Sequence, residues 1–597
     1  MIRVKSIPNS IRPIRVSGAL ASPLLRGGGL PDIAVLCMLG GVIAMVIAFA
    51  REFEGPLRQA VQIDLRASAL PRYALYSLSR GVSALIISYL FALGFGWAAA
   101  KSRVAERILL PVLDILQSIP VLGFLPGLVL GLMSLFPTRN VGLELAAILM
   151  IFTAQAWNLA LSFYGSLKGL PAPLREASQM SGWGSSRTFW RLEVPAAAQG
   201  LVWNGMLSMA GGWFFLMVNE AFRLGDHDYR LPGIGSYMSV ALDQGNVPAM
   251  AGAILAMIIM IVCVDQLLWR PLVVWVEKFR LDDAAGETET SWVLEFLRRA
   301  RLPRRVAVLR RRAYRTARRA TLPLYRPLQA AAAPIVAKAP RLRRVHPIFR
   351  RLGVAILVTA FAAGAMVGLW KLGLLLRQLG RADWGILVVT SGLTFARVIG
   401  AVALSTAWAL PAGVIIGRSP RLARLMQPII QVVAAFPAPM LFPLVILLLE
   451  RMGIGLGLGA VGLMVLSGQW YILFNVISGV AALPEQLKDA ATVFQLSNFA
   501  RWRTLYLPAA FPALVTGWLT AAGGAWNGSI VAEYIEVGGS LRTTQGLGSL
   551  ISDATAHANF PLLAGGIASM SLIVVGWNRL MWRPLMRWAS HRFGLGQ

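Results

Sequence analysis

Four charged residues stand in apolar stretches of this chain, where charge is rare. Glu220 and Glu533 occur in similar settings, Val-Asn-Glu-Ala-Phe and Val-Ala-Glu-Tyr-Ile, and Arg80 and Arg397 also recur as a pair. A charge at the centre of a membrane costs about 2.5–3.5 kcal/mol on insertion scales, so each one asks for a partner or a function. Two interpretations stay open. The four residues belong to an outer gate or solute path, in which the arginines could partner the acids or attract an anion, or they are interface residues that reach water or a neighbouring span.

A second group of candidate residues lies in a polar segment between apolar runs, Leu170–Pro195, which returns later as Leu483–Pro508. We call these segments the first and second elbows. A proline near the start of each, Pro171 or Pro173 and then Pro484, is typical of a helix opening. Glycines interrupt the first elbow, and Ser185 or Ser186 is expected to cap a second short helix. Each elbow is therefore predicted to be a bent pair of short helices.

The elbows carry an acid followed by small residues and, in the first copy, a glycine. The positions are Glu176, Ala177, Ser178 and Gly182 in the first elbow, and Asp489, Ala490, Ala491 and Gln495 in the second. This pattern resembles the cytoplasmic EAA loop of the membrane subunits of ABC importers, and both copies keep the same spacing from the acid to a closing proline. The alternative without a specific function is an ordinary amphipathic connecting loop. Because the second elbow has Gln495 in place of glycine, it is expected to bend less sharply, and Glu176 is expected to contribute more to coupling than Asp489.

The resemblance implies partners. Each elbow would dock as a coupling helix on one subunit of a separate ABC ATPase, which gives two ATPase copies and a probable solute-binding protein. The chain has no Gly-x-x-x-x-Gly-Lys-Ser/Thr motif to cradle nucleotide phosphates. We therefore expect no cofactor and no catalytic residue in this chain, with ATP and Mg on the partner ATPase.

Further motifs resemble the permeases of the nitrate, sulfonate and taurine importer group. These are PVLDILQSIPVLGFLP, a Trp-Asn or Trp-Tyr pair within a span, and Gly-Leu-Gly-Ser-Leu. The resemblance covers roughly 75–280 and 390–590. It implies the fold of a type I ABC importer transmembrane domain and a location in the bacterial inner membrane. Trp157 and Trp470, the tryptophans of the pair, could line a translocation path; the alternative is packing or anchoring at the membrane interface.

The composition agrees with a polytopic membrane protein. Of 597 residues, 56% are hydrophobic and 14% charged, and the mean hydropathy is +0.63. The formal charge of +30 is interpreted as membrane topology rather than nucleic-acid binding, because basic residues gather in loops beside apolar runs. Cys37 and Cys263 lie inside apolar runs and predict neither a disulfide nor a metal site. Asp226-His227-Asp228 is interpreted as a polar loop, so no metal is expected.

The apolar runs predict about 12 transmembrane helices. The first, at 33–50, is expected to be an uncleaved span with the N-terminus inside, although Ala48-Phe49-Ala50 leaves a cleaved signal open. The third, at 108–135, is broken by prolines and should line the interior, since kinked backbone is tolerated in lipid only where protein or water satisfies it. The predicted domains are 1–72 (tail, first span and outer segment), 73–280 (first permease repeat), 281–352 (basic cytoplasmic linker), 353–385 (extra span) and 386–597 (second permease repeat).

The two halves are a tandem duplication. Arg80 matches Arg397, and Trp269-Arg270-Pro271-Leu272 matches Trp582-Arg583-Pro584-Leu585. With both elbows inside, the repeats are parallel and related by an axis along the membrane normal. The predicted class is an all-α polytopic membrane protein of two parallel repeats.

The function favoured is the fused membrane subunit of an ATP-driven importer that passes a small solute, for which an anion such as nitrate, a sulfonate or taurine is a candidate. An ion-coupled secondary transporter also uses repeats and broken helices, but it has no need of elbows. A non-transport scaffold that uses the basic linker is the third alternative. Co-purification of an ATPase separates the first from the others.

Overall fold

The computed structural model describes residues 30–53, 55, 61–118, 120–224, 227–279, 291–299, 359, 363–364, 366–537 and 540–593. The chain divides into two units. One contains the described residues of Ile43–Ser291 and Leu342–Gln597, and the other contains the start of helix α1 (Leu30–Phe53) and helix α12 (Trp292–Arg299). Both predicted repeats lie in the larger unit. The N-terminal tail before residue 30, most of the basic linker and part of the extra span predicted at 353–385 lie outside the described residues.

The first repeat is built from long apolar helices joined by short ones. In chain order its elements are α2 (Leu70–Lys101), α3 (Arg103–Ser118), η2 (Val121–Phe124), α4 (Leu125–Leu135), α5 (Val141–Lys168), α6 (Ala172–Met180), α7 (Ser185–Thr188), η3 (Phe189–Glu193), α8 (Val194–Glu220), β1 (Arg223–Leu224), β2 (His227–Asp228), α9 (Ile234–Asp243), α10 (Val247–Val264), η4 (Asp265–Trp269), α11 (Arg270–Val276) and η5 (Glu277–Phe279), preceded by η1 (Ala67–Ala69).

Apart from η1 and η5, the second repeat has counterparts of these elements in the same order among the described residues. They are α15 (Arg381–Gly417), α16 (Pro420–Ala435), η6 (Ala438–Met440), α17 (Phe442–Arg451), α18 (Leu456–Ala481), α19 (Glu485–Val493), α20 (Asn498–Arg501), η7 (Trp502–Tyr506), α21 (Leu507–Ala532), β3 (Tyr534–Val537), β4 (Ser540–Thr543), α22 (Leu547–Ala556), α23 (Phe560–Trp577), η8 (Asn578–Trp582) and α24 (Arg583–Phe593). Elements η3, η4, η7 and η8 are π-helical turns, so these irregular turns also recur in pairs.

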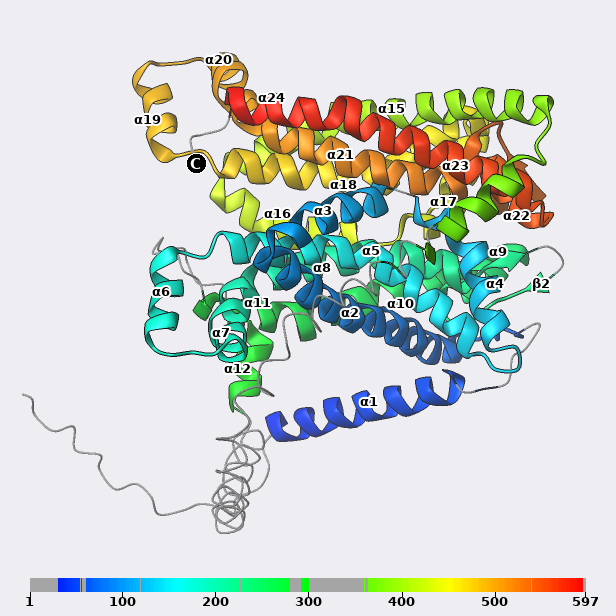
Figure 1. The fold of residues 1–597 in the computed structure, drawn as a ribbon, viewed down its shortest axis with the longest axis horizontal. Helices are drawn as coiled ribbons and strands as arrows, with labels where there is room; N and C mark the ends of the chain where they lie inside the picture. The colour runs from blue at the N-terminus through cyan, green and yellow to red at the C-terminus, as the bar shows by residue number, and fades with distance from the viewer. Residues whose placement is uncertain are drawn as a thin grey trace, which may run out of the picture. The chain divides into compact units, whose positions relative to one another are not determined.

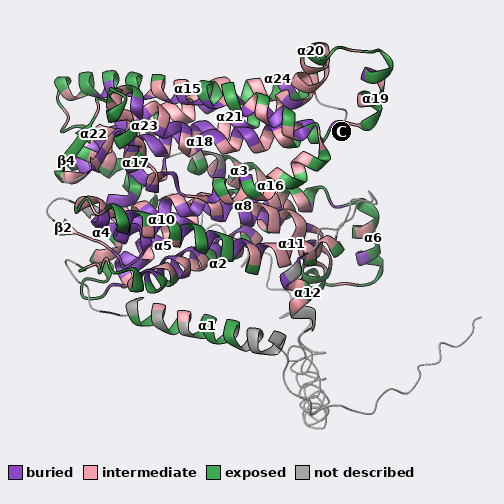
Figure 2. Ribbon diagram, turned by 180° about the vertical axis from the view of Figure 1, so that it is seen from behind, coloured by how far each residue is buried: buried purple, intermediate pink, exposed green. Residues whose placement is uncertain are grey.

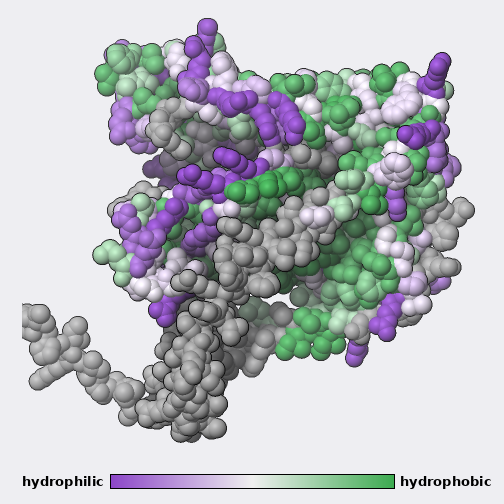
Figure 3. All heavy atoms as spheres, in the orientation of Figure 1, coloured by the Kyte–Doolittle hydropathy of each residue, from purple (hydrophilic) through white to green (hydrophobic). Residues whose placement is uncertain are grey.

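The two repeats run in the same direction. Helix α2 packs on α5 and α5 on α8, as α15 packs on α18 and α18 on α21. The elbow helices α6 and α19 lie at one end of the bundle, and α9 and α22 lie at the other (Figures 1 and 2). On the face drawn in Figure 3, hydrophilic side chains gather at the two ends and hydrophobic ones between them. The all-α class and the two parallel repeats are confirmed.

Eight helices of the described part of the chain are long and apolar enough to cross a membrane, four in each repeat. The run predicted as a third span is divided: α3 ends at Ser118, η2 follows Pro120, and α4 completes the path. The break at this proline was expected, and the second repeat has it again between α16 and α17. Helix α1 covers the first predicted span. The total of about 12 stays a prediction.

Close helix packing in each repeat depends on a glycine at the same place. A Cβ on Gly96 of α2 would lie 2.9 Å from Phe163 and 3.1 Å from the carbonyl oxygen of Ala160, both in α5. A Cβ on Gly413 of α15 would lie 2.7 Å from Val476 in α18. Small residues let membrane helices approach closely, and in lipid this packing replaces the hydrophobic effect as the source of association.

We therefore expect Gly96→Leu and Gly413→Leu to push the paired helices apart, at a cost of about 1–3 kcal/mol each. Gly94→Leu is the matched control, because a Cβ on Gly94 meets nothing within 4 Å. Thermal unfolding of the purified protein in detergent measures the effect. Equal melting temperatures for Gly94→Leu and Gly96→Leu would contradict this account.

Candidate functional site

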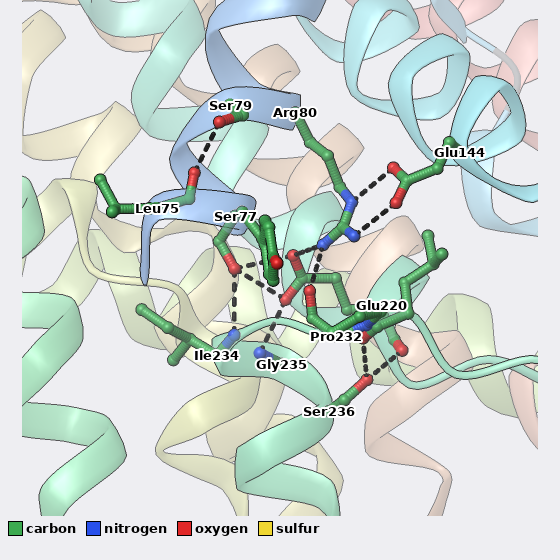
Figure 4. Close-up of polar contacts among 12 residues, drawn as sticks. Leu75, Ser77, Ser79, Arg80, Glu144, Glu220, Pro232, Ile234, Gly235 and Ser236 are labelled. Carbon is green, nitrogen blue, oxygen red and sulfur yellow. Dashed lines mark hydrogen bonds and ion pairs between the residues drawn. The ribbon is translucent and has the colours of Figure 1, made fainter. Parts of the chain in front are cut away.

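The first candidate group is a buried ion-pair cluster in the first repeat. Arg80, from α2, donates from Nε and Nη2 to the two carboxylate oxygens of Glu144 in α5, at 2.7 and 2.6 Å. Its Nη1 donates to Glu220, the last residue of α8, at 2.7 Å, and to the carbonyl oxygen of Pro232 at 2.8 Å (Figure 4). The side chains of all three charged residues are 0% exposed. One guanidinium thus pairs with two carboxylates and joins three spans.

Glu220 has further partners that fix the segment after α8. Ser77 donates to its carboxylate at 2.7 Å, and the backbone N–H of Gly235 donates at 2.8 Å. Ser236 donates to the carbonyl oxygen of Glu220. Because Gly235 and Ser236 lie in the first turn of α9, the cluster attaches this short helix to α2 and α8, as Figure 4 shows.

The second repeat contains the same cluster with one acid fewer. Arg397 donates to Glu533 at 2.8 Å, and Thr394 occupies the place of Ser77, donating to the same carboxylate at 2.9 Å. Where Arg80 meets Glu144, Arg397 Nε donates to the carbonyl oxygen of Gly457 at 3.1 Å. The Arg397 side chain is 13% exposed and that of Glu533 is 0% exposed. The described charges of this cluster sum to zero, whereas Arg80, Glu144 and Glu220 together carry one negative charge when all are ionised.

Sequence reasoning named four of these residues but missed Glu144. Pairing between the repeats was the signal that found the others, and Glu144 has no acidic counterpart, since glycine occupies the equivalent position. An acid at the fourth residue of an otherwise apolar α5 was the available signal. The structure contains the ion pairs between the named arginines and acids that the sequence left open.

A central cavity of about 310 Å³ lies between the two repeats. Trp157 and Asn158 from α5 and their counterparts Trp470 and Tyr471 from α18 line it. Lining residues also come from the broken segments: Val121 of η2 donates its backbone N–H to Asn527 of α21 at 2.9 Å, a link between the repeats. Arg80, Arg397, Glu220 and Glu533 are not among the described residues that line this cavity.

A polar contact between the repeats lies beside the cavity. Gln431 of α16 donates to Asp265 at 3.1 Å, and Arg270 donates to the other oxygen of the same carboxylate at 3.2 Å. Asp265 is the first residue of the π-helical turn η4, and its counterpart in η8 is Asn578. The acid is thus held at the interface and is absent from the equivalent position of the other repeat.

Both elbows end their first helix in the same way. Gly182 has a φ of 64° and Gln495 a φ of 50°. The N–H of Trp183 bonds to the carbonyl of Ser178, and that of Leu496 bonds to the carbonyl of Ala491, which makes a Schellman motif in each elbow. The expectation that the second elbow bends less sharply is wrong. Backbone hydrogen bonds impose the same bend even though glutamine there carries a Cβ.

The acids of the two elbows lie on the exposed sides of their short helices. Glu176, Ala177 and Asp489 are exposed and Ala490 is partly exposed, whereas Ser178 and Ala491 are buried. The predicted serine cap of the second short helix is wrong in the first elbow, where Gly184 precedes α7 without a side-chain cap. In the second elbow Ser497 takes that role and accepts from Ala500 at 3.2 Å.

An ion pair connects the first elbow to a neighbouring span. Lys101, at the end of α2, pairs with Glu193, at the end of the elbow. Just before the elbow, Lys168 at the end of α5 donates to Glu106 of α3 at 2.8 Å, and hydrogen bonds from Lys168 and Tyr164 hold the pKa of Glu106 below its usual range. The end of the elbow is therefore held to α2, and the end of α5 is held to α3.

The metal-site alternative has no support in the described residues, among which no group of three possible metal ligands is found. Asp226 lies outside them.

Two regions of the chain, residues 91–268 and 409–577, match the family model described as "Binding-protein-dependent transport system inner membrane component". Parts of the chain are also similar to individual permeases. A putative ABC transporter permease of Methanocaldococcus jannaschii is 26% identical over 34% of this chain and 76% of that protein. The trimethylamine N-oxide transport system permease TmoV of Pelagibacter ubique is 27% identical over 32% of this chain and 25% of that protein. The nitrate import permease NrtB of Synechococcus elongatus is 26% identical over 27% of this chain and 52% of that protein.

We expect Arg80→Met to destabilise the protein more than Arg397→Met. The first change leaves two buried carboxylates without a cation and the second leaves one, and breaking a buried pair typically costs about 3–5 kcal/mol. Thermal unfolding in detergent compares them. Adding Glu144→Gln to Arg80→Met should recover part of the loss, and an equal loss in the two single variants would refute the difference between the clusters.

Gln495→Gly should stabilise the second elbow by about 1 kcal/mol, because a left-handed conformation strains a residue with a Cβ. Gly182→Gln should destabilise the first elbow by a similar amount, although a Cβ there meets nothing within 4 Å. Limited proteolysis of the elbows and thermal unfolding report both changes. The strain account fails if Gln495→Gly increases cleavage of the second elbow.

Proposed function

Because the chain belongs to the family of binding-protein-dependent transport system inner membrane components, we propose that it is the complete permease of an ATP-driven importer. In this proposal one chain supplies both halves that other systems assemble from two permease subunits. It passes a small solute across the bacterial inner membrane by alternating access between its repeats. It does no chemistry itself, since ATP and Mg bind to two copies of a separate ATPase.

The observation that carries the proposal is the position of the two elbows relative to the cavity. Both elbows protrude from the same end of the bundle, and the cavity is lined by both repeats. The elbows carry exposed apolar side chains, among them Met180 at 89%, Val493 at 79% and Phe494 at 77%. Apolar groups exposed on a short, braced helix favour docking on another protein. A movement of the two ATPase subunits would then shift the helices around the cavity.

Solute delivery is the second part of the proposal. The end opposite the elbows bears α9, α22 and the two hairpins, β1 with β2 and β3 with β4. We place a solute-binding protein on this end. The relatives are named for solutes of different charge, nitrate for one and trimethylamine N-oxide for another. The relatives alone therefore leave the charge of the solute open.

The decisive experiment is co-purification. The tagged chain is purified from its native membrane with whatever ATPase it retains, and the complex is reconstituted in lipid nanodiscs. We expect an assembly with two ATPase copies whose hydrolysis rises when the solute-loaded binding protein is added. If no ATPase assembles and solute uptake follows an ion gradient instead, the chain is a secondary transporter. If neither occurs, the scaffold alternative gains support.

The elbow acids provide the matching variants. We expect Glu176→Ala and Asp489→Ala each to lower stimulated hydrolysis several-fold, and the double variant to abolish it, with thermal stability unchanged. Glu176 and Asp489 are exposed and lie in the middle of their nine-residue helices, beyond the first turn in which a carboxylate interacts with the helix dipole, so a folding defect is not expected. Since the two elbows bend alike, the single variants should have similar effects, which replaces the expectation that Glu176 matters more.

Glu485→Ala is the control for these variants, because Glu485 is an exposed acid of the same helix as Asp489 and pairs only with Lys488 among the described partners. It should leave stimulated hydrolysis close to normal. Full coupling in the Glu176→Ala and Asp489→Ala double variant would remove the elbow acids from the mechanism.

A further inference from the structure

The central cavity has a lining whose chemistry is unusual for an anion path. Among the described residues that line it, ten are aromatic and none is Asp, Glu, Lys, Arg or His. The aromatic ones include Trp157, Trp470, Tyr471, Trp526, Trp577 and Trp582. Sequence reasoning placed four charged residues near a solute path, but these residues pair with one another in the Arg80 and Arg397 clusters. The described lining of the cavity therefore consists of aromatic rings, apolar groups and neutral polar groups.

An anion gains little from such a lining. Leaving water costs an ion much of its hydration energy, and this cost is recovered inside proteins by pairing with an opposite charge or by several hydrogen bonds. Aromatic ring faces carry the negative part of the ring quadrupole, so they repel an anion that packs against them. The same faces attract ammonium groups, and tryptophan attracts them most strongly.

Two hydrogen-bond donors of the lining lack a protein acceptor. The indole N–H groups of Trp157 and Trp577 are buried and have no partner in the described structure. Trp157 comes from α5 of the first repeat and Trp577 from the end of α23 in the second. Their rings are held by edge contacts, Trp157 with Phe91 and Trp577 with Phe395. A buried donor without a partner is costly, so an acceptor oxygen brought by a solute would satisfy it.

We propose that this cavity binds a small zwitterion or dipolar solute without net negative charge. Its positive end, an ammonium group or the alkylated nitrogen of an amine oxide, packs on the aromatic rings, and its oxygen accepts from the indole N–H of Trp157 or Trp577. The proposal rests on the proposed import function, because it assigns the solute class to the path of that permease. It replaces a simple anion such as nitrate as the favoured cargo and retains taurine, a zwitterion, from the earlier candidates.

The test uses two solutes that share a sulfonate and differ in one ammonium group. Taurine is a zwitterion and ethanesulfonate is an anion. Binding of each, together with trimethylamine N-oxide and nitrate, is measured on the full-length chain in nanodiscs through the NMR signals of 5-fluorotryptophan. No ATPase and no binding protein is present, so the specificity measured is that of this chain.

We expect taurine or trimethylamine N-oxide to saturate, with ethanesulfonate and nitrate at least tenfold weaker. Trp157→Phe and Trp577→Phe keep a ring but remove the N–H, and at least one of them should weaken the favoured solute about fivefold, as expected for one lost hydrogen bond. Trp275→Phe is the control, since Trp275 is 45% exposed and does not line the cavity.

A charge variant tests the electrostatic argument directly. Asn158 is exposed within the lining, so Asn158→Lys would bring an ammonium group into the cavity. It should raise affinity for ethanesulfonate and lower it for taurine. The proposal is overturned if ethanesulfonate or nitrate binds the unmodified chain as tightly as the zwitterions, if none of the four solutes saturates, or if neither tryptophan variant changes binding.

Failure of this proposal and failure of the import function are separable. If an ATPase assembles with the chain and responds to the elbow variants, but nitrate binds more tightly than the zwitterions, only the proposed solute class is refuted. Selective binding of a zwitterion without an ATPase partner refutes only the import function.

Discussion

A guanidinium buried in an apolar bundle must be neutralised where it stands, and this requirement fixes one end of each repeat. Arg80 cannot reach water, so Glu144 and Glu220 have to meet it, and with them come α5, α8 and the first turn of α9. Arg397 does the same for the second repeat with Glu533 and a backbone carbonyl. Because removing either arginine leaves a buried carboxylate without a cation, these clusters resist gradual rearrangement. They hold α9 and α22 to the long helices at the end of the bundle opposite the elbows.

The end of the bundle that bears the elbows is built on backbone conformation instead of charge. In each elbow a Schellman motif turns the chain after the first short helix, and its hydrogen bonds come from main-chain groups alone. This explains why the motif persists when its glycine is replaced by Gln495. The strain of one left-handed residue is small beside the set of hydrogen bonds that requires it. A bend defined by the main chain leaves the outward side chains free to fit a partner.

Sequence reasoning predicted the class, the duplication and the elbows, because each leaves a pattern that can be compared between the halves. It failed where the halves differ. The residue equivalent to Glu144 in the second repeat is Gly457, so comparison of the repeats did not identify Glu144. The bend at Gln495 was predicted wrongly because the prediction considered only the residue type, whereas backbone hydrogen bonds determine the conformation. The neutral lining of the cavity could not be predicted either, since Trp157 and Trp577 are distant in sequence and line the same cavity only because the two repeats pack together.

Fusion of the repeats in one chain explains how such differences can arise. In a symmetric dimer of identical subunits every substitution appears twice, so an acid placed at the interface would face its own copy. In a fused chain Asp265 can bond to Gln431 while Asn578 takes the equivalent position. Charge can likewise be confined to one cluster, as Glu144 is, without a second acid opposite. The described residues that line the cavity between the repeats can therefore all be uncharged even though each repeat carries buried ions, and this separation is what the proposed zwitterionic solute requires of the cavity.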